Sequence, residues 1–174
     1  MEYLFVDFIR SNSTLSEYMI LADNLNESGI FLNSEAKTRW GIIKEMIHLA
    51  AESSLIPKED EAKVNSALVA REKSMSTGIG KGVAIPHCTI PNIKNLVVLL
   101  ATSQKGINFD SIDSLPVRIV IMLLVPKEKL EYHIKTLASI ARLMSDEIFK
   151  QGLLAFTSPA EVISYISSYE SGKK

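Results

Sequence analysis

The feature that most constrains the fold is a nearly continuous apolar run from Val117 to Val125, in which only Arg118 is polar. Such a run is typical of a strand buried on both faces, because a half-buried strand alternates apolar and polar residues. A second run, Leu96–Ala101, is short, apolar and partly β-branched, and it also predicts a strand. The 174 residues are enough to bury a substantial core around these strands.

Helical patterns surround the two strands. Ser34 is placed to cap the first helix, and Ser158-Pro159-Ala160-Glu161 is a capping box with proline at the first helical position of the last one. In chain order, the predicted helices are 35–51, 58–70, 127–144 and 159–168. Helices interleaved with strands indicate a layered α/β fold.

One continuous domain is expected from residue 19 to residue 168. The Ser/Asn-rich segment 11–14 predicts a flexible break, so residues 1–18 form an N-terminal extension that is either flexible or a short helix. Residues 169–174 are expected to be a flexible tail. The chain therefore has a single candidate unit in which to look for chemistry.

Charge and composition exclude several classes of protein. The 19 Lys and Arg residues are balanced by 20 Asp and Glu residues, which argues against a nucleic-acid partner. The longest uninterrupted apolar stretch, Ile119–Pro126, is too short to insert across a membrane. Cys88 is the only cysteine, which excludes an intrachain disulfide, and the histidines show no metal-ligand spacing. We expect a cytoplasmic protein that needs neither a metal nor a cofactor.

The most distinctive segment runs from Thr77 to His87, with glycines at every second position before a short apolar run and Pro-His. A dinucleotide fingerprint fails here because Val83 and Ile85 occupy the positions that require glycine, and a P-loop fails because Gly82 follows Lys81. The apolar run predicts a short strand with His87 at its end. Spacing alone leaves two interpretations open: a tight turn with a half-exposed histidine, or a histidine that faces a ligand or another protein.

The remaining candidate groups are ambiguous. His133 falls within the apolar stripe of its helix, and the pattern alone favours a core histidine, whereas His48 is expected at a helix end or surface. A nucleophilic pair of His87 and Cys88 is disfavoured, because adjacent side chains diverge along a strand. The charged residues 71–73 are typical of a solvated helix end, unless Arg71 turns towards the glycines as an anion clamp.

Taken together, the segments 71–73 and 76–87 resemble the phosphorylation-site signature of enzyme IIA domains of the bacterial phosphotransferase system, of the fructose/mannitol type that includes the nitrogen-regulatory proteins. Further resemblance lies at 106–113, 116–117, 123–126, 133 and 137–143. It implies a single domain with a mixed β-sheet flanked by helices on both faces. It also implies that His87 accepts a phosphoryl group and that His133 and Arg71 lie in the same active site. The predicted phosphoryl-binding loop is Thr77, Gly78, Gly80 and Gly82.

The resemblance also implies partners. The phosphoryl donor would be an HPr-like phosphocarrier protein. The phosphorylated protein would either control regulated target proteins, as in the nitrogen branch, or pass the group to a cysteine of an enzyme IIB for sugar uptake. An inactive module is disfavoured because Arg71, His87 and His133 are all retained. Cys88 stands where relatives often carry Gly or Ala, and two interpretations stay open: the side chain fills space, or it makes the site sensitive to oxidation.

Overall fold

The apolar run forms the central strand of a mixed sheet, β6 (Val117–Pro126), and all but one of its residues are buried. Its neighbours are β5 (Val97–Ile107) on one side, and β3 (Val83–Ala84) followed by β4 (His87–Ile90) on the other. β5 is antiparallel to β6, whereas β3 and β4 are both parallel to it. The prediction of a strand buried on both faces is confirmed.

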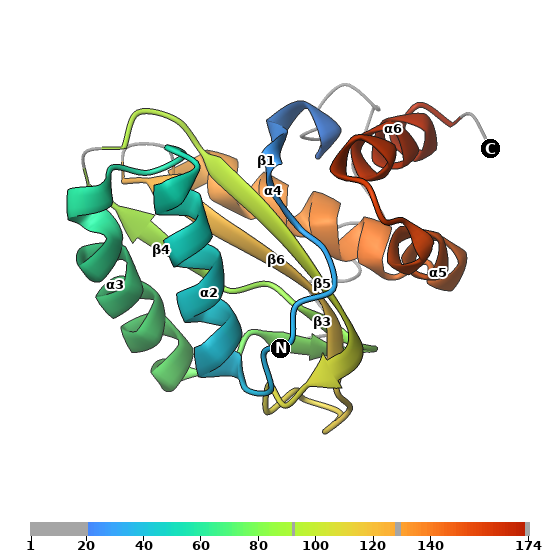
Figure 1. Ribbon diagram of the computed structural model, residues 1–174, viewed down its shortest axis with the longest axis horizontal. Helices are drawn as coiled ribbons and strands as arrows, with labels where there is room; N and C mark the ends of the chain where they lie inside the picture. Colours follow the sequence, from blue (N-terminus) through green and yellow to red (C-terminus); the bar gives the residue numbers. More distant parts are fainter. Residues whose placement is uncertain (1–20, 92, 128–129, 173–174) are drawn as a thin grey trace.

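The computed structural model describes residues 21–91, 93–127 and 130–172, and for residues 130–135 it describes the backbone alone. Within these ranges, the sheet has six strands in the order β1–β5–β6–β3–β2, with β4 paired to β6 beyond the end of β3 (Figure 1). The elements not yet introduced are η2 (Ala22–Asn24), β1 (Leu25–Phe31), α2 (Arg39–Glu52), η3 (Lys58–Asp60), α3 (Glu61–Ser74), β2 (Gly78–Gly80), α4 (Leu130–Met144), α5 (Glu147–Ala155) and α6 (Pro159–Glu170).

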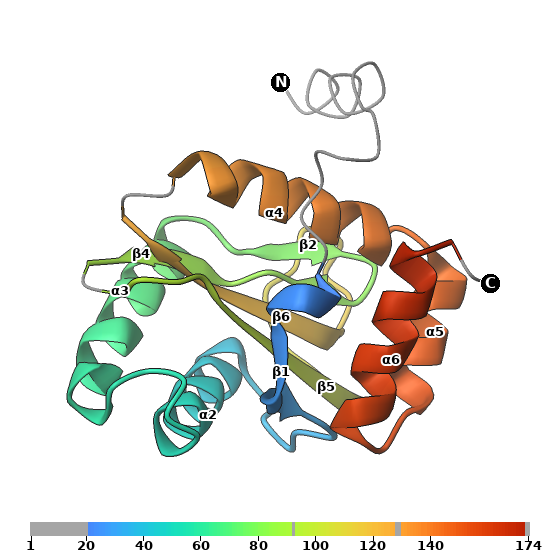
Figure 2. The same cartoon turned by 90° about the horizontal axis from the view of Figure 1, so that it is seen from above.

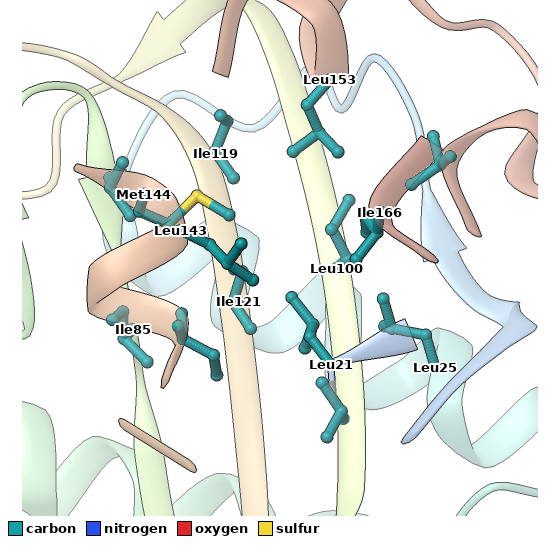
Figure 3. Packing of buried hydrophobic residues seen from close by; sticks show 14 of the residues in the cluster. Leu21, Leu25, Ile85, Leu100, Ile119, Ile121, Leu143, Met144, Leu153 and Ile166 are labelled. Atoms are coloured by element: carbon teal, nitrogen blue, oxygen red, sulfur yellow. The ribbon is translucent and has the colours of Figure 1, made fainter. Parts of the chain in front are cut away.

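Helices cover both faces of the sheet, as expected for this fold class. Helices α2 and α3 pack on one face, and α4, α5 and α6 pack on the other (Figures 1 and 2). Alternate residues of β6 face opposite sides of the sheet. Ile121 packs in the core on the α4–α6 side, and Met122 packs in the core on the α2–α3 side. Figure 3 shows the core on the α4–α6 side, where residues of β1, β5, β6 and the three helices meet.

The first helix begins later than predicted. Its N-cap is Thr38, whose side chain accepts a hydrogen bond from the Gly41 amide, and not Ser34. The reason is a short parallel bridge, in which the Lys37 carbonyl accepts from the Asn108 amide and the Asn108 carbonyl accepts from the Arg39 amide. This pairing holds residues 35–38 in an extended path, so the helix cannot start before Thr38.

The other predicted elements are found with shifted ends. The predicted helix 58–70 is η3 followed by α3, which ends at Ser74, and the predicted strand 96–101 continues as β5 to Ile107. The last helix begins at Pro159 as predicted, but the Ser158 side chain makes no capping hydrogen bond and the helix ends at Glu170. Strand β1 and helix α5 were not predicted. The N-terminal extension and its break at 11–14 lie outside the described residues.

Candidate active site

His87 is the first residue of β4, and not the last residue of the preceding strand. The predicted strand is divided by Pro86, which has no N–H to donate to a ladder. The chain pairs with β6 on both sides of the proline, since Val83 lies opposite Ile119 and His87 lies opposite Leu123. Successive β4 side chains point to opposite faces, so His87 faces the α4 side, where Leu123 is also found, while Cys88 packs against the α2–α3 core.

The hydrogen bonds of His87 define which ring nitrogen is nucleophilic. Its Nδ1 lies 2.8 Å from the carbonyl oxygen of Ile85. A carbonyl can only accept, so the proton of the neutral ring resides on Nδ1 and the lone pair on Nε2. Arg71 donates from Nε to Nε2 at 3.3 Å. The arrangement therefore presents Nε2 as the reactive atom, next to a fixed positive charge.

His87 is held in its neutral form. Burial of the half-exposed ring is the largest cause that lowers the pKa of His87, and the neighbouring Arg71 guanidinium lowers it further, while the hydrogen bond to Ile85 opposes both. A lowered pKa keeps the imidazole uncharged near neutral pH. The neutral imidazole is the form that can attack an electrophile.

Arg71 reaches His87 from the last turn of α3. Its guanidinium also donates from Nη1 to the carbonyl oxygen of Met75, at 2.9 Å, just after the helix ends. Arginine has five N–H groups in a fixed planar fork, and such a fork suits phosphate and carboxylate oxygens. Arg71 thus has the position and the chemistry of the anion clamp that was one interpretation of the sequence.

The glycine segment forms a β-hairpin whose two ends lie apart. Thr77 is close to the histidine, because its carbonyl accepts from the Ile85 amide at 3.0 Å. Gly80 and Gly82 have positive φ angles in the turn at the other end. Along β6, the turn is separated from His87 by at least four residues, or about 13 Å at 3.3 Å per residue. The structure therefore does not bring Gly80 and Gly82 to His87.

The backbone amides at the His87 end of the hairpin already donate hydrogen bonds to other groups. The Thr77 amide donates to the Glu72 carboxylate at 3.0 Å, and the Gly78 amide donates to the hydroxyl of Ser76 at 3.2 Å. Gly78 is required for a steric reason, since an added Cβ would lie 2.8 Å from the Cα of Ser111. The predicted phosphoryl-binding loop is thus a supporting hairpin in this conformation.

Glu72 is a residue of the site that the sequence did not reveal. The prediction of a solvated helix end is wrong for it, because Glu72 is only 2% exposed. Its carboxylate accepts from the backbone amide of Thr77 and from the Thr77 hydroxyl, the latter at 2.6 Å. These two residues are five apart across a helix end, a separation that has no periodic signature in a sequence.

The remaining predicted groups have simpler environments. His133 lies in the first turn of α4, and its side chain is outside the described residues. His48 is at the surface of α2, as predicted, with Nδ1 3.1 Å from Glu61. Burial raises the pKa of the Cys88 thiol to about 12. A buried, protonated thiol is a poor nucleophile, which argues against both the Cys–His pair and ready oxidation.

The described residues contain no group of three or more His, Cys, Asp or Glu side chains that could hold a metal ion. In the same part of the chain, no helix is long and apolar enough to cross a membrane.

Comparison with known proteins gives one consistent family. The sequence model described as "Phosphoenolpyruvate-dependent sugar phosphotransferase system, EIIA 2" matches residues 23–169. The nitrogen regulatory protein of Escherichia coli K12 is 32% identical over 161 residues, which cover 92% of this chain and 94% of that protein. The fructose-specific EIIABC component of Bacillus subtilis is 27% identical over 152 residues, 87% of this chain, but the match spans only 24% of that longer protein.

Solved structures agree with the sequence comparison. The crystal structure of the nitrogen regulatory protein IIA-Ntr from Neisseria meningitidis superimposes with a TM-score of 0.76 and 31% sequence identity. The match covers 85% of this chain and 99% of that one. The expected mixed sheet with helices on both faces is therefore found in a solved relative as well.

Proposed function

The chain belongs to the EIIA 2 family of the phosphoenolpyruvate-dependent sugar phosphotransferase system, and from this premise we propose that it is a phosphohistidine carrier. In this proposal, His87 accepts a phosphoryl group on Nε2 from an HPr-like protein, which makes the chain a protein-histidine phosphotransferase. The observation that carries the proposal is the position of Nε2, with the proton held on Nδ1 by Ile85 and a guanidinium at 3.3 Å.

The transfer needs little beyond positioning and charge stabilisation. The lone pair of Nε2 attacks the phosphorus of the donor phosphohistidine, and the P–N bond to the donor breaks as the P–Nε2 bond forms. The electron pair of the broken bond returns to the donor imidazole. The ring of His87 gains positive charge during attack, and the Ile85 carbonyl, which accepts from Nδ1–H, stabilises that charge.

Arg71 would bind the transferred group. Its Nε–H now points at the nitrogen that becomes phosphorylated, so the same guanidinium can donate to phosphoryl oxygens once the P–Nε2 bond exists. His133 is proposed as the second active-site histidine. The α4 side of the sheet, which His87 faces, is the side from which His133 would approach.

We propose a regulatory, nitrogen-type role in which the phosphorylation state of His87 controls binding to target proteins. The support is that the E. coli nitrogen regulatory protein matches more of this chain, and at higher identity, than the fructose-specific component of B. subtilis does. The structural similarity to IIA-Ntr agrees with this. The alternative is a sugar-specific enzyme IIA that passes the phosphoryl group to an enzyme IIB cysteine. The match to the fructose-specific component supports this alternative.

The proposal is tested by incubating the protein with phosphorylated HPr and following acid-labile, base-stable phosphate. Wild type and His48→Ala should both be labelled, because His48 is on the surface of α2 and outside the site. His87→Ala should not be labelled, and nitrogen-resolved NMR should place the phosphoryl group on Nε2. Label on His87→Ala, or on Nδ1 of His87, would overturn the assignment.

A second step separates the two roles. The phosphorylated protein is mixed with a fructose-type enzyme IIB, and the location of the label is followed over time. Rapid transfer to the enzyme IIB cysteine favours the sugar-specific alternative. Label that stays on His87, with binding of a target that differs between wild type and His87→Ala under phosphorylating conditions, supports the regulatory role.

A further inference from the structure

A buried polar network lies behind the candidate site. Glu72, near the end of α3, accepts two hydrogen bonds from Thr77, and one of its oxygens lies 3.8 Å from Nη1 of Arg39 at the start of α2. Arg39 in turn forms an ion pair with Asp110 at 3.0 Å, in the loop that follows β5. The end of α3, the start of α2 and the loop after β5 are therefore joined through Glu72 and Arg39.

Burying a carboxylate is costly unless it is fully hydrogen-bonded and paired. Glu72 is 2% exposed, yet its neighbour in sequence, Arg71, projects to the site. Such a buried charge is weak evidence for stability by itself, because a well-packed apolar side chain often does as well. The question is what the hydrogen bonds of Glu72 hold in place.

The bonds of Glu72 lead to both partners of His87. Thr77, which Glu72 holds by amide and hydroxyl, accepts through its carbonyl from the Ile85 amide at 3.0 Å, and the Ile85 carbonyl accepts from Nδ1 of His87 at 2.8 Å. The same clamp fixes the segment that leaves α3. That segment includes Met75, whose carbonyl accepts from Arg71 at 2.9 Å.

We propose that Glu72 is a positioning residue for phosphoryl transfer at His87. By holding Thr77, it fixes the Ile85 carbonyl that sets the tautomer of His87, and it fixes the turn on which the Arg71 guanidinium rests. Arg39, itself paired with Asp110, completes the network by placing a positive charge 3.8 Å from the Glu72 carboxylate. This inference rests on the proposed function.

The test compares Glu72→Gln with a matched control, Glu61→Gln, at the partly exposed start of the same helix. Glutamine keeps the shape of glutamate but has a single acceptor oxygen, so it cannot accept both bonds of Thr77 in the same way. With phosphorylated HPr as donor, we expect the maximal rate for Glu72→Gln to fall by about 10- to 100-fold, as for other small misplacements of a reacting group. The half-saturating donor concentration should stay within about twofold of wild type, because the interaction lost is made in the transition state.

A second measurement separates positioning from loss of charge. The nitrogen chemical shifts of His87 report its tautomer, which is set by the hydrogen bond from Nδ1 to the Ile85 carbonyl at 2.8 Å. Removing a charge by itself leaves that hydrogen bond in place, whereas a displaced Ile85 carbonyl lets the proton move to Nε2. We expect a larger Nε2–H population of His87 in Glu72→Gln and the wild-type tautomer in Glu61→Gln.

The outcomes are distinct. An unlabelled wild type would overturn the proposed function and the inference with it, whereas a labelled wild type with an equally fast Glu72→Gln variant would overturn the inference alone. An unchanged tautomer of His87 in the variant would also overturn it. Thermal unfolding monitors the fold, and if Glu72→Gln does not fold, Thr77→Val removes one bond of the same clamp while keeping the β-branched shape. A maximal rate for Thr77→Val equal to wild type would then reject the inference.

Discussion

Replacement of Arg71 tests the chemistry of the candidate site most directly. Methionine keeps the unbranched chain but removes the N–H groups that contact His87 and Met75. A hydrogen bond from a charged group contributes about 1.5–3 kcal/mol. If that bond is made to the phosphoryl group in the transition state, Arg71→Met should slow phosphorylation of His87 by about 10- to 150-fold. Single-turnover labelling with phosphorylated HPr measures the rate.

The same substitution should change the pH dependence. Burial is the larger cause that lowers the pKa of His87, and Arg71 adds to it. Without Arg71 the pKa rises towards the ordinary value, so more of the imidazole is cationic and unreactive at mildly acidic pH. The acid limb of the rate profile should therefore move to higher pH, and NMR titration of His87 should show the same shift.

Lys73→Met is the matched control, because it removes one positive charge from the same turn of α3 at an exposed position. We expect its rate to stay within about twofold of wild type. The reasoning would be refuted if Arg71→Met were as fast as wild type, or if Lys73→Met were equally slow.

Two further predictions concern the frame of the site. Gly78→Ala would place a Cβ 2.8 Å from the Cα of Ser111, and overpacking of this kind costs about 1–3 kcal/mol, or about 2–12 °C in Tm for a chain of this size. Circular dichroism should show this loss for Gly78→Ala but not for Gly41→Ala, whose nearest contact is 3.4 Å; equal Tm values would contradict the close contact. Cys88, buried and with its pKa raised to about 12, should react with iodoacetamide at pH 8 far more slowly in the folded protein than in denaturant, as measured by mass spectrometry, and equal rates would contradict its burial.

The parts of the fold that the sequence predicts are those where one segment determines its own environment. The run that forms β6 is apolar at every position except Arg118, so it is expected to be buried on both faces. The helices α2 and α4 are predicted because their apolar residues recur at helical spacing.

The parts that the sequence does not predict depend on a distant partner. Residues 26–28 of β1 are polar and exposed, and the strand exists because Leu25 and Ile30 pair with β5. The start of α2 depends on the bridge between residues 37–39 and Asn108. The glycine pattern indicates a tight turn beside His87, whereas the register on β6 puts the turn at the far end of a hairpin.

The same distinction explains how much of the candidate site was accessible. His87 and Arg71 were identified by resemblance, and the structure places Arg71 Nε 3.3 Å from His87 Nε2. Glu72 looked like one charge among several at a helix end. Its burial follows from the path of the chain after α3, which turns back so that Thr77 covers it. No local pattern encodes that return.

The anchoring of the hairpin determines what a partner protein would detect when His87 is phosphorylated. The hairpin is fixed near His87 by Glu72, and it is fixed at its turn by Lys150, whose Nζ donates to the carbonyl of Lys81 at 2.8 Å. A phosphoryl group adds nearly two negative charges at pH 7. With both ends of the hairpin anchored, the change that a partner would meet is one of charge beside Arg71 and the 70% exposed Met75, and not one of backbone shape. A single rigid site can therefore serve transfer to another protein or regulation of one, and the partner's surface decides between them.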